Sequence, residues 1–504
     1  MQKPRIETSV AALLFTATLS LGIVYLYIDR VIAIRGSYLI IGLAATYWTL
    51  TREEVYTNDF PKNVSKNQLK LYLSACLICL SFSIIINNRI VILFLVVPAG
   101  MWLIIKSAIS ENKPVIKVIM LSMSVFLIGS LSKYFTTGYY YGNTDNFLHM
   151  VKVQKLISTG TFNGFRGIYD FYPIMHVLAG IIRYVTGLPV YDSAILLMIF
   201  SFTSIIPLSY IFSKSVLNNR AVATFAPISV VLFTYYSTQS LYFYPNGFGF
   251  VIIFYLLYVA SRSSGSNASF GYMYKIFILA LIFTHHLAFI IFLTLVASLF
   301  IIHRTICRYY PLIDKNSIIG NLQPLVYGAI GAGVWWWYSG FFKSMYQVGS
   351  GIVAAGLNFS VATGSGVRED NLIYLGVTPA EETVLSAIVQ LLVNDAPYFG
   401  LLLTIVLLGV IEYYNNDKEL SKIPVLVVGL ASSLIMFKSP VVLKLLPRFR
   451  IIFGMLFLLI LSYGLKYLIE KGAATKNITV LGLVLIAGTT SPLLAADDLN
   501  NRYG

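Results

Sequence analysis

Long apolar runs recur from one end of the chain to the other, and they constrain its fold more than any other feature. A helix that crosses a hydrocarbon core of about 30 Å needs some 17–25 mostly apolar residues. Hydrophobic residues make up 57% of the 504 residues and charged residues only 11%, whereas soluble domains are about 25% charged. The sequence therefore predicts an all-α fold, a polytopic bundle of transmembrane helices.

The apolar runs divide the chain into about 13–15 predicted spans. We divide the run at 270–302 in two, because one long span would place the basic residues that follow it on the outer side. The spans are predicted at 9–28, 36–50, 71–87, 90–105, 115–134, 191–213, 222–236, 246–260, 270–283, 287–302, 322–340, 397–413, 423–438, 450–468 and 477–494.

Lysine and arginine set the orientation, since short cytoplasmic loops retain them. With Lys3 and Arg5 inside, more than half of the lysines and arginines fall in predicted cytoplasmic loops. The sequence thus predicts a multi-pass protein of the plasma membrane with a cytoplasmic N-terminus. Segments 135–190 and 341–396 then become extracytoplasmic loops.

The net charge of +15 does not indicate a nucleic-acid partner. Basic residues are scattered between the apolar runs instead of lying on one amphipathic element. Topology and contact with membrane lipids explain them better. The three cysteines, Cys76, Cys79 and Cys307, fall in or beside apolar runs, so a disulfide framework is not expected.

The segment 134–172 is a polar island. Asp145 and His149 would share one face of a helix at positions i and i+4, and Asp170, Tyr172 and His176 follow. A carboxylate where a span meets water indicates a functional site, although an acid in a first helical turn also simply complements the helix dipole. After Pro173, an apolar stripe over 174–185 predicts a helix that lies along the membrane surface.

Two further polar groups are predicted on the outer side. His285 and His286 lie at the hinge between two short runs; adjacent histidines are a poor metal pair, so they either bind a phosphate or hydroxyl group or are satisfied inside the bundle. Arg448 and Arg450 precede the span at 450–468 and either grip phosphate or extend to lipid headgroups. The WWWY run at 335–338 is typical of an interfacial aromatic belt.

The order of Asp145, His149 and the Asp170-Phe171-Tyr172-Pro173 run resembles the first external loop of GT-C glycosyltransferases. The nearest likeness is to the catalytic subunit of archaeal and bacterial oligosaccharyltransferases and their single-sugar relatives. Paired short spans that meet at an external hinge, and an arginine at the start of a late span, also resemble that fold. The resemblance covers 115–504 and leaves 1–114 as a four-helix N-terminal addition.

This resemblance implies an inverting transferase that moves a sugar from a polyprenyl (dolichyl-like) phosphate donor to a glycan, lipid or protein acceptor. Asp145 would be the general base. His149, Asp170 and Tyr172 would contact substrate, and Arg448 or Arg450, with His285 or His286, would hold the phosphate.

No cofactor is certain, because the segment 237–247 lacks the second acidic pair that would hold Mg²⁺ or Mn²⁺ in this family. Two alternatives stay open. One is a transporter or flippase of a lipid-linked sugar, although the sequence shows neither symmetric halves nor broken midplane helices. The other is a polysaccharide polymerase or ligase, which uses the same lipid-phosphate chemistry.

Overall fold

The fold is given by a computed structural model of the full chain. It describes residues 13–18, 43–47, 49, 64–87, 89, 91–110, 114–137, 144–161, 171–262, 268–309, 323–343, 396–416 and 457–470.

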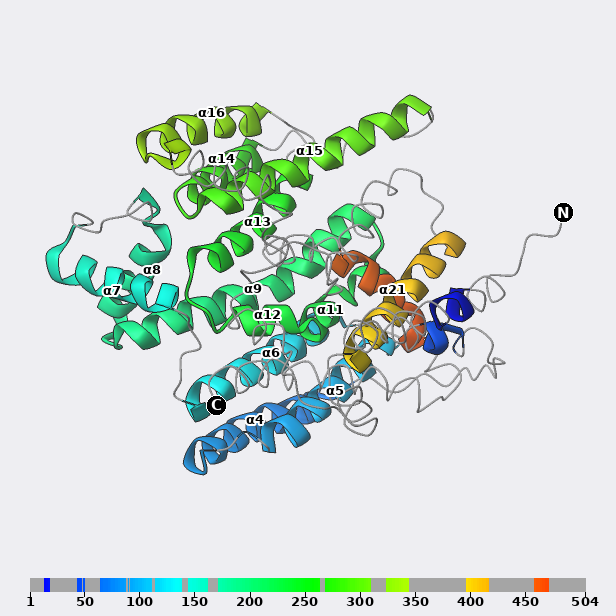
Figure 1. The fold of residues 1–504 in the computed structure, drawn as a ribbon. Helices are drawn as coiled ribbons and strands as arrows, with labels where there is room; N and C mark the ends of the chain where they lie inside the picture. Colours follow the sequence, from blue (N-terminus) through cyan, green and yellow to red (C-terminus); the bar gives the residue numbers. More distant parts are fainter. Residues whose placement is uncertain are drawn as a thin grey trace, which may run out of the picture.

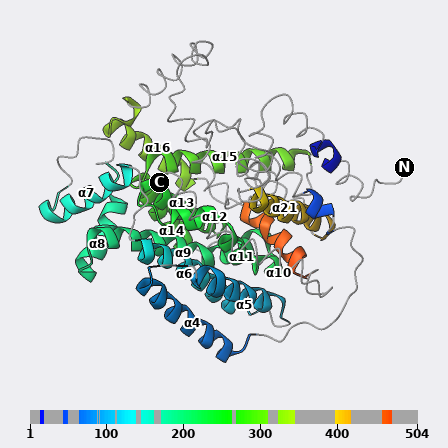
Figure 2. The ribbon, with the colours of Figure 1, turned by 60° about the horizontal axis from the view of Figure 1, so that its bottom comes forward.

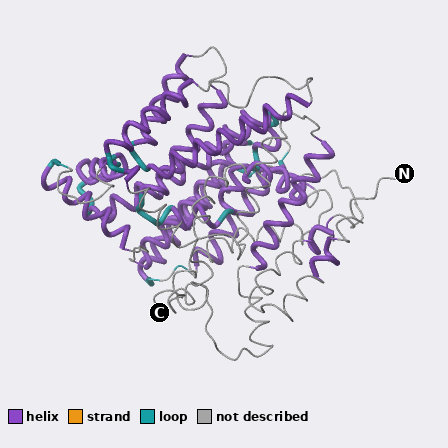
Figure 3. Tube along the Cα trace, turned by 45° about the horizontal axis from the view of Figure 1, so that its top comes forward, coloured by secondary structure: helices purple, strands orange, loops and turns teal. Residues whose placement is uncertain are grey.

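Most of the described residues are helical, with short loops between the helices and no strand among them (Figure 3). The helices are α4 (Lys66–Ile85), the π-helix η1 (Ile92–Val96), α5 (Val97–Ile109), α6 (Val115–Thr137), α7 (Thr144–Thr159), α8 (Ile174–Thr186), α9 (Val190–Leu217), α10 (Arg220–Ala223), α11 (Ala226–Leu232), α12 (Thr234–Gln239), α13 (Pro245–Arg262), α14 (Ala268–Ile282), α15 (His286–Tyr309), α16 (Gln323–Tyr338) and α21 (Ala396–Asn416). A further helix covers 457–470.

Three of these helices are long and apolar enough to cross a membrane. They are Lys66–Ile85, Val115–Thr136 and Val190–Leu217, which match the spans predicted at 71–87, 115–134 and 191–213. The spans predicted at 9–28, 36–50, 423–438 and 477–494 lie wholly or largely outside the described residues. The described parts of the other predicted spans coincide with helices, apart from 222–236.

Local sequence explains several helix ends. Ser65 and Gln68 form a capping box at the start of α4, each side chain bonding the other residue's backbone N–H, which satisfies two of the free donors at a helix start. Helix α8 begins directly after Pro173 and stops at Gly187, which adopts a left-handed conformation with φ of 73°. Glycine takes this conformation without steric cost.

Helix α9 lies at the centre of the arrangement (Figures 1 and 2). On one side it packs against α6, which in turn contacts α4 and α5. On the other side it packs against α13, followed by α14 and then α16. Helices α7 and α8 pack on each other and on α9 at one end of this stack, so the polar island is folded over the ends of the long helices.

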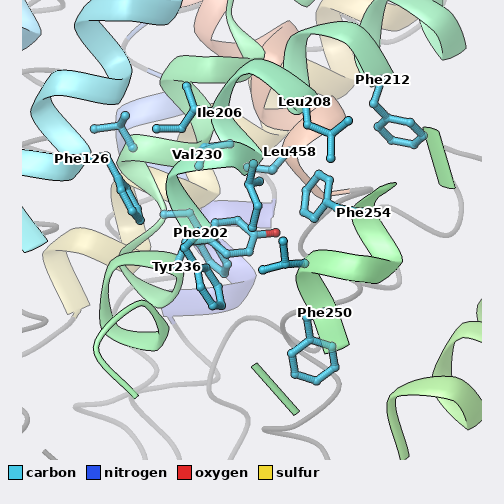
Figure 4. Packing of buried hydrophobic residues seen from close by; sticks show 14 of the residues in the cluster. Phe126, Phe202, Ile206, Leu208, Phe212, Val230, Tyr236, Phe250, Phe254 and Leu458 are labelled. Atoms are coloured by element: carbon cyan, nitrogen blue, oxygen red, sulfur yellow. The ribbon is translucent and has the colours of Figure 1, made fainter. Parts of the chain in front are cut away.

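Aromatic side chains fill the space around α9 (Figure 4). Tyr236 is fully buried, with its ring centroid 6.2 Å from that of Phe202 and 6.1 Å from that of Phe254. Leu458 reaches the same cluster from the helix over 457–470. The core therefore joins elements from the middle and the end of the described chain.

The prediction of a single span over 222–236 is wrong. The chain here forms three short helices, α10, α11 and α12. Pro227 lies in the first turn of α11, where it has no N–H to donate and its ring would clash with the Ala223 carbonyl of a continuous helix. Phe233 then adopts an extended backbone and ends α11.

Two glycines let α21 and the helix over 457–470 cross closely. A Cβ atom on Gly464 would overlap the Ile405 carbonyl, and one on Gly409 would overlap the Ile460 carbonyl. Small residues of this kind allow helix backbones to approach within membranes. Nearby, the Lys466 ammonium lies 2.6 Å from a Glu412 carboxylate oxygen, an ion pair that joins the same two helices.

Candidate functional site

The polar island contains helix α7, and helix α8 follows it where a helix was predicted over 174–185. Helix α7 begins at Thr144, so Asp145 lies in its first turn and His149 follows one turn later. His149 is buried, and Asn146, Met150 and Val153 line the same inward face. The side chain of Asp145 lies outside the described part of the structure.

His149 and His176 form a buried pair between α7 and α8. The His149 Nδ1 atom lies 2.9 Å from the His176 Nε2 atom, and the ring centroids are 5.1 Å apart. One nitrogen donates and the other accepts, which requires at least one ring to be neutral. Close packing supports the pair, because Gly180 of α8 lies against Leu156 and Ile157 of α7.

The environment of the pair favours neutral imidazoles. Burial lowers the pKa of His149 to about 2, and His176 and then Lys152 add to this effect. Burial also lowers the pKa of His176 to about 4, with a contribution from Lys152 and an opposing one from the Tyr172 backbone. Both histidines are therefore uncharged at neutral pH, since a buried imidazolium would lack solvation.

Tyr172, His285 and His286, all predicted substrate-binding residues, lie together. The Tyr172 ring centroid is 5.3 Å from that of His286 and 6.2 Å from that of His285, and the two histidine rings stack at 4.3 Å. The structure thus brings the polar island against the hinge before α15.

His285 also has a structural task at this hinge. Its Nδ1 atom accepts a hydrogen bond from the Leu287 backbone N–H at 3.1 Å, which caps the start of α15. In a neutral ring the proton is therefore on Nε2. This bond supports the alternative that His285 is hydrogen-bonded within the protein, at least through its Nδ1 atom.

The WWWY run divides between two environments. Trp335 donates a hydrogen bond from Nε1 to the Phe171 carbonyl at 3.1 Å, and Phe171 packs edge-on against Trp335 and Tyr338. Trp337 is 81% exposed. The prediction of an aromatic belt therefore suits Trp337, whereas Trp335 positions the residue before Tyr172.

The Tyr172 hydroxyl is buried and makes no hydrogen bond of normal geometry with the described residues. Burial raises the pKa of Tyr172 to about 12, and the nearby Ser339 side chain opposes this rise. A buried hydroxyl without a full partner costs free energy, so this group is suited to donate to a ligand that enters the cluster.

Asp170, Arg448 and Arg450 lie outside the described residues, so their predicted roles stay predictions. The sequence reading did not single out His176 as the partner of His149. It also passed over Asp192, in the first turn of α9, which accepts a hydrogen bond from the Tyr134 hydroxyl. An acid three residues after Pro189, at the predicted outer end of a span, was the available signal for Asp192.

Among the described residues, no group of three or more His, Cys, Asp or Glu side chains is arranged to hold a metal ion. Comparison of the chain with protein-family models, with curated proteins and with solved structures gave no match in any of the three.

Proposed function

We propose that this chain is an integral membrane glycosyltransferase of the GT-C type. It transfers a sugar from a polyprenyl (dolichyl-like) phosphate to an acceptor hydroxyl on the extracytoplasmic side of the plasma membrane, with inversion at the anomeric carbon. The described helices form part of a polytopic bundle in this proposal, with 1–114 as an addition to the catalytic core.

One observation carries the proposal. Two polar segments that are distant in sequence, the island ending at Tyr172 and the hinge at His285–His286, meet at one end of a bundle of apolar helices. Helices α7 and α8 cover this end. A transferase that uses a lipid-linked donor has to bind the polar head group of the lipid at the membrane boundary and leave its hydrocarbon chain in the bilayer. Polar segments at one end of an apolar helix bundle suit such a site.

The proposed chemistry needs a base and an anion site. The Asp145 carboxylate takes the proton of the acceptor hydroxyl while its oxygen attacks the anomeric carbon. The bond from that carbon to the phosphate oxygen breaks, and the carrier leaves as polyprenyl phosphate. His149, Asp170 and Tyr172 position the acceptor, and Arg448 or Arg450, with His285 or His286, stabilises the leaving phosphate.

A transporter or flippase of a lipid-linked sugar is the second candidate. The interrupted helices α10, α11 and α12 favour it, because transporters build their binding sites from discontinuous helices. We prefer the transferase, since Tyr172 lies just before α8 and His285 and His286 lie at the start of α15, not midway along these helices.

A transfer assay separates the two candidates. Purified protein in vesicles is given polyprenyl phosphates that carry a radiolabelled sugar, together with a membrane extract as the source of acceptor. Label in a new product supports the transferase. Label that crosses the bilayer while still on its carrier supports the flippase and rejects the transferase.

A further inference from the structure

A cluster of aromatic and hydroxyl side chains connects the hinge before α15 to the end of α16. It consists of Tyr172, His286, Trp336, Ser339, Phe341 and Phe342. The ring centroid of Phe341 lies 4.2 Å from that of His286 and 5.3 Å from that of Trp336, and the Tyr172 ring lies 5.3 Å from that of His286. The cluster thus extends the candidate site from Tyr172 to Trp336.

Two hydrogen-bond donors are buried in this cluster. The Tyr172 side chain is fully buried. Neither its hydroxyl nor the Trp336 Nε1 atom makes a hydrogen bond of normal geometry with the described residues. Buried Tyr O–H and Trp N–H groups usually have a hydrogen-bond partner. Both groups are therefore suited to pair with a ligand.

Three aromatic rings pack on the Trp336 indole. Phe289 lies edge-on with its ring centroid at 5.9 Å, Phe342 lies edge-on at 6.0 Å, and Phe341 lies at 5.3 Å. The face of an aromatic ring is only a weak acceptor for an N–H group. An oxygen atom of a ligand would therefore be a much better partner for the indole N–H.

Ser339 links the two donors. Its hydroxyl donates a hydrogen bond to the Trp336 carbonyl at 3.3 Å, and its side chain also lies beside the Tyr172 hydroxyl. Both donors therefore belong to one small region, within the reach of a single ligand.

The cluster reaches the surface of the protein at Phe342. The Phe341 side chain is 5% exposed, whereas that of Phe342 is 44% exposed. An exposed side chain changes rotamer within picoseconds to nanoseconds. Rotation of Phe342 would open the Trp336 N–H to a ligand without any movement of α16.

We propose that the acceptor is a sugar, held in this cluster by the Tyr172 hydroxyl and the Trp336 N–H, an inference that rests on the proposed function. A pyranose has oxygens around its edge that accept both hydrogen bonds, and C–H groups on its faces that pack on aromatic rings. The cluster contains no Lys, Arg, Asp or Glu, which suits a neutral ligand. A lipid alcohol offers a single hydroxyl and would leave one donor unpaired.

The test measures binding, not turnover. Purified full-length protein in nanodiscs is titrated with a panel of methyl hexopyranosides, and saturation-transfer NMR detects the bound sugar. Trp336→Phe and Tyr172→Phe each keep an aromatic ring and remove one donor, so each is expected to weaken binding about tenfold. Trp337→Phe makes the same change at the next position, which is 81% exposed, and is expected to leave binding unchanged.

Deoxy analogues of the sugar identify the hydroxyl that each donor binds. The analogue that lacks the partner of Trp336 should bind the wild type about tenfold more weakly, yet bind Trp336→Phe as well as the parent sugar does. Phe342→Ala should fold, because the side chain lies at the surface, and should weaken binding through lost packing. Unchanged affinity in all three cluster variants, or no binding of any pyranoside, would overturn the proposal.

Alternative acceptors separate this inference from the proposed function. If a serine- or threonine-containing peptide or a long-chain alcohol receives the labelled sugar in the transfer assay while pyranosides do not bind, the sugar acceptor is wrong and the transferase stands. If pyranosides bind in a manner that depends on Trp336 but the protein transfers no sugar, the site stands and the proposed function is wrong.

Discussion

The Nδ1 atom of His149 lies 2.9 Å from the Nε2 atom of His176, across the buried contact between α7 and α8. This contact joins α7 of the polar island to α8 through groups that titrate. Protonating both rings would remove the only acceptor in the pair and bury two like charges.

The pair predicts that the protein loses stability in mild acid. An unfolded histidine has a pKa near 6.5, above the folded pKa of about 4 for His176 and about 2 for His149. The unfolded state then binds more protons, so the stabilising contribution is full above pH 6.5 and falls as pH drops toward the folded pKa values. Between pH 7.5 and pH 5 the loss should be about 2 kcal/mol per histidine.

Thermal melting of the detergent-solubilised protein between pH 5 and pH 7.5 measures this effect. The double variant His149→Gln/His176→Gln serves as the control, because neither side chain titrates in this range. Its melting temperature should change much less with pH. A variant that loses as much stability as the wild type would show that other groups cause the pH dependence.

Asp145→Asn is expected to fold normally and to transfer sugar about 10²–10⁴-fold more slowly, because the amide cannot accept the acceptor's proton. The variant should elute from a sizing column and melt like the wild type. Asp170→Asn is the matched comparison. A large loss with Asp170→Asn and near-full activity with Asp145→Asn would move the base to the second acid.

Tyr172→Phe separates binding from folding. Its hydroxyl, like that of Tyr274 in α14, is buried and lacks a hydrogen bond of normal geometry among the described residues. Removing either hydroxyl should leave the melting temperature unchanged or slightly higher. Only Tyr172→Phe should raise KM for the acceptor, by about tenfold; an equal rise for Tyr274→Phe would show an indirect effect.

Gly464→Ala is expected to destabilise the protein by about 1–3 kcal/mol, because the added methyl group meets the Ile405 backbone carbonyl and α21 has to move. Gly331→Ala in α16 is the control, since its Cβ would meet nothing within 4 Å. That change should stabilise the helix by up to about 1 kcal/mol. Melting temperatures that fall equally would contradict the close crossing.

Membrane topology can be measured by labelling single cysteines. In a background without Cys76, Cys79 and Cys307, we expect an impermeant maleimide applied to intact cells to label Phe147→Cys on α7 but not Lys66→Cys at the start of α4. Both positions are exposed in the fold, so permeabilised cells should show labelling at each. The reverse pattern would place the candidate site in the cytoplasm.

The sequence predicted the helices and breaks that depend only on neighbouring residues. The stripe over 174–185 predicted α8, and the polar break between two short runs predicted the hinge at His285. The same stripe is half-buried or exposed in the fold, while Met175, His176, Ala179 and Gly180 face inward. Both sets of residues, the apolar stripe and the buried face, recur at helical spacing. The spacing alone therefore cannot show which face of α8 packs against the rest of the protein.

Contacts between distant segments could not be predicted in this way. His149 was matched with Asp145 because the two are one turn apart, whereas its observed partner is on the next helix. Pro227 was visible in the sequence, but the apolar run around it hid the break in 222–236.

In the polytopic membrane bundle that we propose, this break implies an order of assembly. Every side chain of α11 is buried, and the Ser229 hydroxyl reaches that of Ser462 at 3.3 Å. Lipid offers no hydrogen-bond partner to the backbone groups left free at interruptions of a helix, so such a segment has to be enclosed by protein. During synthesis, the chain around residue 229 emerges long before residue 462. It must therefore stay near water or the insertion machinery until the late helix arrives to enclose it.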